Sequence, residues 1–185
     1  MKNDFNFCPN CGSRSVKNYN NRKWVCPDCG YELFCNIAAA VGVIIYDDCG
    51  NVLFEVRAKN PRKGFLALPG GFVDADESAE NAVRRECKEE LCAELDDVKF
   101  LCSNPNTYEY RGIEYKTCDL FFTAKLPKQF STIDEFIKSL HRQESEVESL
   151  VCKKVSSVEE VVSLPLAFGS AVSTLKKWLE EKHEH

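Results

Sequence analysis

The chain has 185 residues, enough for one domain with a small appendage. Hydrophobic residues make up 44% and charged residues 29%, ordinary globular values that exclude wholesale disorder. The formal net charge is −5, so we expect no broad electrostatic binding to nucleic acid, which depends on basic patches. No apolar run approaches the roughly 18 residues of a spanning helix, so we expect no membrane partner.

The N-terminus lacks the basic-then-apolar layout of a signal peptide, and we therefore expect a cytoplasmic protein. In a reducing compartment, the 11 cysteines are better explained by metal binding and packing than by disulfides. Four of them have the spacing of metal ligands. The other seven are interpreted as small hydrophobic side chains: Cys35, Cys49, Cys87, Cys92, Cys102, Cys118 and Cys152.

Residues 1–34 are poor in aliphatic side chains and cannot build an apolar core, so this segment needs a cross-link. Its cysteines follow the spacing C-x2-C-x14-C-x2-C, which suits tetrahedral zinc: Cys8, Cys11, Cys26 and Cys29. The alternatives are four unconnected thiols or two disulfides. Because four cysteines leave no open coordination position, Zn²⁺ here is predicted to be structural.

The segment between the cysteine pairs is basic and aromatic, with Lys17, Tyr19, Arg22 and Lys23. These residues could form a face that touches a partner. The favoured alternative is that Trp24 packs the segment against the rest of the protein.

After residue 36 the composition becomes that of a mixed sheet with helices. We expect strands over residues 37–46, 52–57, 98–103, 115–125 and 149–155, with a strand–loop element at 67–73. A turn is expected at 47–51, and a loop or hairpin at 107–112. Helices are expected over 78–91 and 168–181, and a short helix or excursion over 131–140. This mixture of strands and helices predicts an α/β or α+β fold.

The helix over residues 78–91 is the clearest, because an apolar residue recurs every fourth position: Ala79, Val83, Cys87 and Leu91. Beside that stripe, Glu86, Glu89 and Glu90 span an arc of roughly 100°. Three carboxylates so close repel one another, and a bound Mg²⁺ or Mn²⁺ would relieve the repulsion. The alternative is a solvated acidic face.

The surrounding sequence decides between these alternatives. Residues 71–93 resemble the Nudix box, G-x5-E-x7-R-E-U-x-E-E-x-G-U, where U is apolar. The matching positions are Gly71, Glu77, Arg85, Glu86, Glu89 and Glu90. Cys92 replaces a glycine of the pattern, and an αL conformation there would cost about 1 to 2 kcal/mol.

The resemblance implies a Nudix α/β/α sandwich with a mixed β-sheet over residues 37–185, preceded by a small zinc ribbon over 1–34. It also implies that Glu86, Glu89 and Glu90 bind Mg²⁺ or Mn²⁺ and that one of them acts as general base. The carbonyl of Gly71 would be a further ligand, and Glu77 with Arg85 a supporting pair.

Many Nudix hydrolases use one more glutamate from a loop after the box. Glu146, followed by an apolar residue and a strand, matches that position best, and Glu144 is second choice. A solvated acidic loop is the alternative.

The resemblance further implies cleavage of the diphosphate linkage of a nucleoside diphosphate derivative. ADP-ribose or a nucleotide sugar is the first expectation, and a nucleoside triphosphate or NADH the alternative. The downstream signature of NADH pyrophosphatases is absent from residues 96–118. Candidates for stacking the base or pairing phosphate are Phe65, Tyr108, Tyr110, Tyr115, Arg57, Arg62 and Arg111.

A protein of another class is a competing interpretation: a non-catalytic Nudix regulator that senses a nucleotide and binds a partner through its ribbon. Loss of the box carboxylates would be its mark, and here they are intact. The expected partner is thus a small-molecule nucleotide. A homodimer is also compatible with the resemblance, since similar proteins often dimerise.

Overall fold

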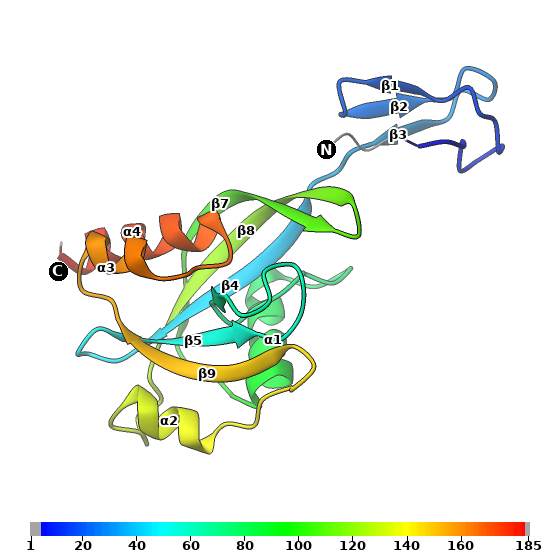
Figure 1. The fold of residues 1–185 in the computed structure, drawn as a ribbon. Helices are drawn as coiled ribbons and strands as arrows, with labels where there is room; N and C mark the ends of the chain where they lie inside the picture. The colour runs from blue at the N-terminus through cyan, green and yellow to red at the C-terminus, as the bar shows by residue number, and fades with distance from the viewer. Residues whose placement is uncertain (1–4, 184–185) are drawn as a thin grey trace.

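The N-terminal segment folds as an antiparallel ribbon of three short strands, β1 (Lys17–Tyr19), β2 (Lys23–Val25) and β3 (Glu32–Phe34). In the computed structural model, which describes residues 5–183, this ribbon projects from the body of the molecule on a short connection (Figure 1). Trp24 is only 3% exposed, but its ring lies inside the ribbon, with its centroid 4.9 Å from that of Phe5. The expectation that Trp24 packs against the main domain is therefore wrong: Trp24 is buried among the ribbon's own residues, beside the exposed Phe5.

The body is built on a six-stranded mixed sheet in the order β6-β5-β4-β8-β7, with β9 also paired to β5. Its strands are β4 (Ala38–Tyr46), β5 (Asn51–Arg57), β6 (Leu66–Ala67), β7 (Val98–Tyr110), β8 (Ile113–Lys125) and β9 (Val147–Lys154). The pair β4–β8 is parallel, whereas every other pair in this sheet is antiparallel. The sheet is therefore mixed, as expected for the Nudix fold.

Helices cover both faces of this sheet: α1 (Ala79–Leu91) and α2 (Ile133–Ser139) on one face, α3 (Val158–Ser163) and α4 (Gly169–His183) on the other (Figure 1). Two apolar clusters fill the two interfaces. Val43 and Ile45 belong to the α1 side, while Ile44 between them belongs to the α4 side. This alternation follows from the two-residue period of a strand and produces the predicted α/β/α sandwich.

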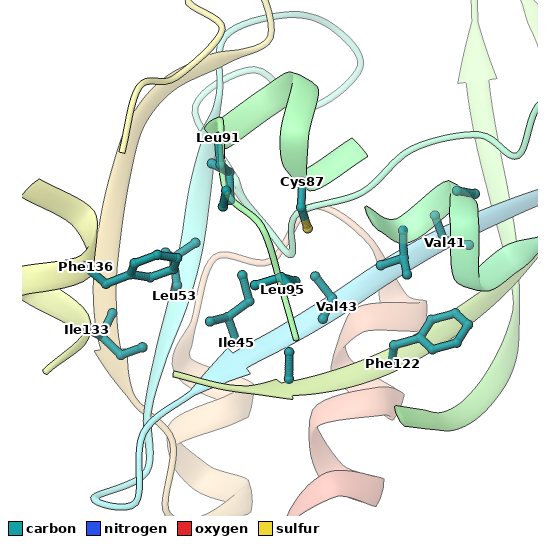
Figure 2. Packing of buried hydrophobic residues seen from close by; sticks show 14 residues of the cluster. Val41, Val43, Ile45, Leu53, Cys87, Leu91, Leu95, Phe122, Ile133 and Phe136 are labelled. Carbon is teal, nitrogen blue, oxygen red and sulfur yellow. The ribbon is translucent and has the colours of Figure 1, made fainter. Parts of the chain in front are cut away.

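Helix α1 packs on the sheet through the stripe identified in the sequence. Val83, Cys87 and Leu91 are fully buried in the first cluster, to which Leu53 and Phe136 also belong. Figure 2 shows the side chains of Cys87 and Leu91 pointing from α1 into this cluster. The hydroxyl of Ser78 caps the first turn by accepting a hydrogen bond from an amide N–H. The apolar stripe thus fixes the rotation of α1, and with it the side on which the acidic arc emerges.

Cys92 ends this helix in the left-handed region, at φ 52° and ψ 32°. Its amide donates back to the Lys88 carbonyl, and the next amide, of Ala93, donates to the Cys87 carbonyl. A glycine would adopt this conformation without steric strain, which explains why the box pattern has glycine here.

Several local expectations need correction. Of the loop or hairpin expected at 107–112, the structure has the hairpin, since β7 and β8 pair up to Tyr110 and Ile113 around a two-residue turn. Helix α3 was not expected; its six residues are too few for a periodic signal. Three of the seven scattered cysteines are exposed rather than packed: Cys35, Cys49 and Cys92. Among the described residues, no helix is long and apolar enough to cross a membrane.

Candidate active site

Two glycines bring the backbone before α1 into close contact with the sheet. Gly70 has φ +143°, and a Cβ there would lie 2.2 Å from the carbonyl oxygen of Val41. A Cβ on Gly71 would lie 2.6 Å from a carboxylate oxygen of Glu86. The Gly71 carbonyl accepts a hydrogen bond from the Val41 amide at 2.8 Å, and its second lone pair remains for another donor or a metal.

Arg85 connects the acidic side chains at the start and middle of α1. Its guanidinium donates to both carboxylate oxygens of Glu77, at 3.1 and 3.0 Å, and to Glu86 at 2.8 Å. It also donates to the Phe72 carbonyl at 3.0 Å and to Glu89 at 3.4 Å. These hydrogen bonds lower the pKa of Glu77. The geometry is that of a clamp holding the loop before α1 against the helix.

Glu90 is the most buried carboxyl group of the acidic arc, at 7% exposure. It accepts a hydrogen bond from the Gly70 amide at 3.0 Å. Burial raises its pKa to about 8, and the neighbouring charges of Glu86 and Glu146 act in the same direction. Burial also raises the pKa of Glu86, although its contact with Arg85 opposes the shift. Among the described residues Glu90 has no ion-pair partner, and Glu86 shares Arg85 with Glu77 and Glu89.

Glu55 on β5 joins this group, although nothing in its sequence context marked it. It is 5% exposed, one of its carboxyl oxygens has no hydrogen-bond partner among the described residues, and it faces Glu90. Burial, and then the charge of Glu90, raise the pKa of Glu55 well above its usual value. Alternation in β5 would have placed it inside the molecule, but only the tertiary fold pairs it with Glu90.

The loop that carries Glu146 is held at both ends. The Gln143 amide donates to the Glu90 carbonyl at 2.8 Å, and the Ala58 amide donates to the Glu146 carbonyl at 2.8 Å. The Glu146 carboxylate pairs with Lys59. By contrast, the side chain of Glu144 is 82% exposed and points to Arg142. Of the two candidate glutamates, the structure brings Glu146 to the acidic arc.

The acidic arc, the two glycines and Glu146 line one cavity of about 380 Å³, whereas Glu55, Glu77 and Arg85 do not line it. At one end lie the acidic arc, Gly70, Gly71 and Glu146; at the other lie aromatic and polar side chains from β7, β8 and the start of α4. Arg57 and Lys59 also line it and are its basic residues. A hollow with a carboxylate end, two cations and an aromatic end suits a phosphorylated ligand with a flat ring system.

Of the expected aromatic contacts, only Tyr108 lines this cavity. Its ring lies 5.8 Å from Phe168 and 5.5 Å from Phe72, measured between centroids, and Arg57 covers Phe168 at 5.2 Å. Neither Phe168 nor Phe72 was expected at the site.

The remaining stacking and pairing candidates lie elsewhere. The long β7–β8 hairpin carries Tyr110 and Arg111 past the cavity, and they line a neighbouring hollow together with Arg62. The ring of Phe65 is covered by the Arg62 guanidinium, at 5.7 Å, and Tyr115 is exposed on the hairpin. Neither Phe65 nor Tyr115 lines the cavity.

The acidic arc fits a hard divalent cation by its chemistry. Glu86, Glu89 and Glu90 offer carboxylate oxygens, the ligands that Mg²⁺ and Mn²⁺ prefer, and two of them have pKa values raised by burial. A cation would replace the missing countercharge. The three carboxylates do not point to one centre, since Glu86 and Glu89 turn to Arg85 while Glu90 turns to Gly70.

The four ribbon cysteines, in contrast, are gathered as a metal site requires. Their sulfur atoms all lie within 4.8 Å of one another, and the Cys8–Cys29 and Cys11–Cys26 separations are both 3.7 Å. Tetrahedral zinc with bonds of about 2.3 Å separates its sulfurs by about 3.8 Å. The cluster therefore fits structural zinc.

Comparison with known proteins agrees with both halves of this description. Residues 36–177 match the family model described as the NUDIX domain, and residues 3–34 match the NADH pyrophosphatase zinc ribbon domain. The chain belongs to the Nudix family and carries a zinc ribbon in front of its Nudix domain.

Curated relatives have related names but match only in part. The NAD-capped RNA hydrolase NudC of Vibrio atlanticus is 28% identical over 105 residues, 57% of this chain and 38% of that protein. The ADP-ribose pyrophosphatase of Methanocaldococcus jannaschii is 50% identical over 60 residues, 32% of this chain and 35% of that protein. The chain thus spans little more than a third of these relatives' length.

Solved structures share the fold. A Nudix hydrolase from Nitrosomonas europaea has a TM-score of 0.64 and 24% identity, over 100% of this chain and 93% of that one. The Nudix domain of Shewanella oneidensis NrtR, solved with ADP-ribose, has a TM-score of 0.58 and 22% identity, over 82% and 89% of the two chains.

Proposed function

We propose that this protein hydrolyses the diphosphate linkage of a nucleoside diphosphate derivative, yielding a nucleoside monophosphate and a phosphorylated moiety. The observation that carries the proposal is the single cavity in which the box glutamates, the Gly70–Gly71 backbone and Glu146 meet. The complete set of carboxylates favours an enzyme over a regulator that only senses a nucleotide.

In this proposal Glu86, Glu89 and Glu90 hold Mg²⁺ or Mn²⁺, with the Gly71 carbonyl as a further ligand. The bound cation would neutralise the diphosphate and lower the pKa of the attacking water. One glutamate of the arc, or Glu146 beside it, accepts that water's proton.

The other charged residues position these groups. Arg85, held by Glu77, orients the carboxylates of the arc and anchors the loop at Phe72. Arg57 and Lys59 are the cations that would meet the phosphates. Lys59 already pairs with Glu146, so an incoming phosphate would compete for the same ammonium group and free the Glu146 carboxylate.

For the substrate, we propose ADP-ribose or a nucleotide sugar first. The local identity to an ADP-ribose pyrophosphatase supports this choice. NADH is the second candidate, which the type of zinc ribbon and the NudC relatives favour. The missing downstream signature in residues 96–118 argues against NADH. A nucleoside triphosphate is the third.

We further propose that the chain is organised as a ribbon over residues 1–34 and a catalytic domain over 37–185, of which residues 1–4 and 184–185 lie outside the described part. A cytoplasmic location suits a four-thiolate zinc site, because thiols stay reduced there. The resemblance is also compatible with a homodimer.

A substrate panel tests the proposal. Purified protein with Mg²⁺ or Mn²⁺ is given ADP-ribose, NADH, nucleotide sugars, dinucleoside polyphosphates and oxidised nucleoside triphosphates, and a coupled phosphatase reports the products. Glu89→Gln is the test variant, because this side chain is 55% exposed and its replacement should not disturb folding. Glu80→Gln, in the exposed first turn of the same helix, is the matched control.

We expect metal-dependent turnover of one class of compound, a loss of about 100-fold or more in kcat for Glu89→Gln, and no loss for Glu80→Gln. Absence of turnover with every compound, together with binding of a nucleotide, would sink the enzyme proposal in favour of the sensor.

A further inference from the structure

The aromatic end of the cavity contains a buried carboxylate that the proposed hydrolysis does not use. Asp119 on β8 lines the cavity and is only 7% exposed. One of its carboxylate oxygens accepts a hydrogen bond from the Thr117 hydroxyl at 2.6 Å, and the other from the Ser170 hydroxyl at 2.7 Å. Ser170 is held in turn, since its carbonyl accepts a hydrogen bond from Thr174. The orientation of the carboxylate is thus fixed from both sides.

Asp119 has no ion-pair partner among the residues that the structure describes. A buried carboxylate without a countercharge is destabilising unless it is well hydrogen-bonded. Two hydroxyl donors use about half of the four lone-pair positions of a carboxylate. The remaining positions can accept from N–H or O–H groups of a ligand in the cavity.

The position of Asp119 in the sheet separates it from the acidic arc. Its register partner is Ala40 on β4, and Ala40 is bridged on its other side to Phe72 in the loop before α1. Adjacent strands lie about 4.8 Å apart, so Asp119 lies roughly 10 Å across the sheet from the segment that carries Gly71. A ligand whose phosphates meet the arc would therefore present a different part of itself to Asp119.

The surroundings of Asp119 indicate which part that is. Phe168 lies two residues before Ser170, whose hydroxyl binds Asp119, and its ring centroid is 5.8 Å from that of Tyr108. Phe72, in the loop that carries Gly71, packs against Tyr108 at 5.5 Å. Aromatic side chains provide stacking surfaces for nucleobases, which bind every base alike. A group with fixed hydrogen-bonding capacity beside such a surface selects among the bases, and a carboxylate only accepts.

We propose that Asp119 reads the base of the nucleotide, accepting a hydrogen bond from the amino group of a purine stacked against Tyr108. Adenine offers its exocyclic amino group, and guanine offers an amino group next to a ring N–H. A purine without these donors adds no hydrogen bond to the carboxylate, which then keeps only those from Thr117 and Ser170. Because the cavity is taken to hold a nucleotide, this role for Asp119 rests on the proposed function.

Binding of nucleoside monophosphates tests this role independently of hydrolysis, because they contain no diphosphate linkage to cleave. Calorimetry in Mg²⁺ would compare AMP, GMP and purine riboside 5′-monophosphate, whose base stacks like adenine but has no donor. The variants are Asp119→Asn and, as a control with the same change of charge, Asp48→Asn in an exposed turn.

We expect AMP or GMP to bind the native protein about 10- to 100-fold more tightly than purine riboside monophosphate, as for a hydrogen bond to a charged group. Asp119→Asn should remove this advantage and leave the affinity for purine riboside monophosphate unchanged, while Asp48→Asn should behave as the native protein. The tighter of AMP and GMP identifies the purine.

Two results would overturn the proposal. Equal affinity of the native protein for all three compounds would show that the amino group of the base is not recognised. This result does not depend on whether Asp119→Asn folds. An equal loss for all three in Asp119→Asn would show a structural role. If either result came with turnover in the substrate panel, the role of Asp119 would be refuted and the hydrolase proposal would stand. Base-selective binding without turnover would refute the hydrolase proposal and support the role of Asp119.

Discussion

The ribbon and the sheet domain are stabilised by different interactions. Trp24 is the one buried aromatic side chain among the described residues of the ribbon, while Phe5, Phe7, Tyr19 and Phe34 stay exposed, so its strands depend on the four cysteines. The sheet domain buries two apolar clusters, one on each face, with Phe54 and Phe122 fully enclosed. The fold of the ribbon is therefore conditional on a metal ion, whereas that of the sheet domain depends on its own packing.

Removal of zinc should separate the two regions most clearly. We expect chelation, or Cys26→Ser, to unfold the ribbon, since zinc binding contributes about 10 kcal/mol or more in domains of this size. The sheet domain should stay folded and keep any hydrolytic activity within about twofold. Backbone NMR would show residues 8–34 losing their dispersed signals while those of β4 and α1 remain.

Cys35→Ser is the control for that experiment, because Cys35 is exposed and lies outside the cluster. It should leave the ribbon signals unchanged. Survival of the ribbon after complete removal of zinc would contradict the comparison, as would simultaneous unfolding of both regions.

The two regions also differ in how far the sequence predicts them. The zinc site was predictable because its ligands come from two tight turns of fixed spacing, and α1 because its stripe repeats every fourth residue. The glutamates and Arg85 share one loop and one helix, so their spacing implies their proximity. At the aromatic end of the cavity Tyr108 was expected, but Phe168 and Asp119 were missed because they come from distant elements and no local pattern relates them.

Glu55 illustrates the same limit. Its position in β5 indicates burial, yet its neighbour Glu90 belongs to a helix reached only through the tertiary fold. Tyr110 and Arg111 lie in a neighbouring hollow for a related reason, since the length of a hairpin, and thus the position of its tip, depends on pairing that composition does not determine.

The buried Glu55–Glu90 pair predicts that the metal-free sheet domain loses stability as pH rises from about 5 to about 8. The pKa of Glu90 is raised to about 8 and that of Glu55 is raised well above its usual value, whereas unfolded glutamates ionise near pH 4.3. Between these values the folded state binds more protons than the unfolded state, so the free energy of unfolding falls with rising pH. The slope is at most about 1.4 kcal/mol per pH unit for each retained proton.

Urea denaturation in a chelator at pH 5.5, 6.5, 7.5 and 8.5 measures this slope. Glu55→Gln should reduce it, because glutamine resembles the protonated acid and does not titrate. Glu94→Gln, whose side chain is 86% exposed, should not. Added Mg²⁺ should restore stability at high pH, where it balances the ionised carboxylates. A slope that Glu55→Gln leaves unchanged would refute the explanation.

The smallest expected effect concerns the end of α1, where the sheet domain accepts local strain. Cys92 adopts φ 52°, and we expect Cys92→Gly to stabilise the protein by about 1 kcal/mol, since relief of the αL conformation exceeds the extra freedom of glycine in the unfolded chain. The melting temperature should rise by about 2 to 4 °C. Cys92→Ala removes the same exposed thiol and keeps the strain, so it should give no increase. If alanine stabilises as much as glycine, the thiol rather than the backbone is responsible, and the departure from the box pattern carries no conformational strain.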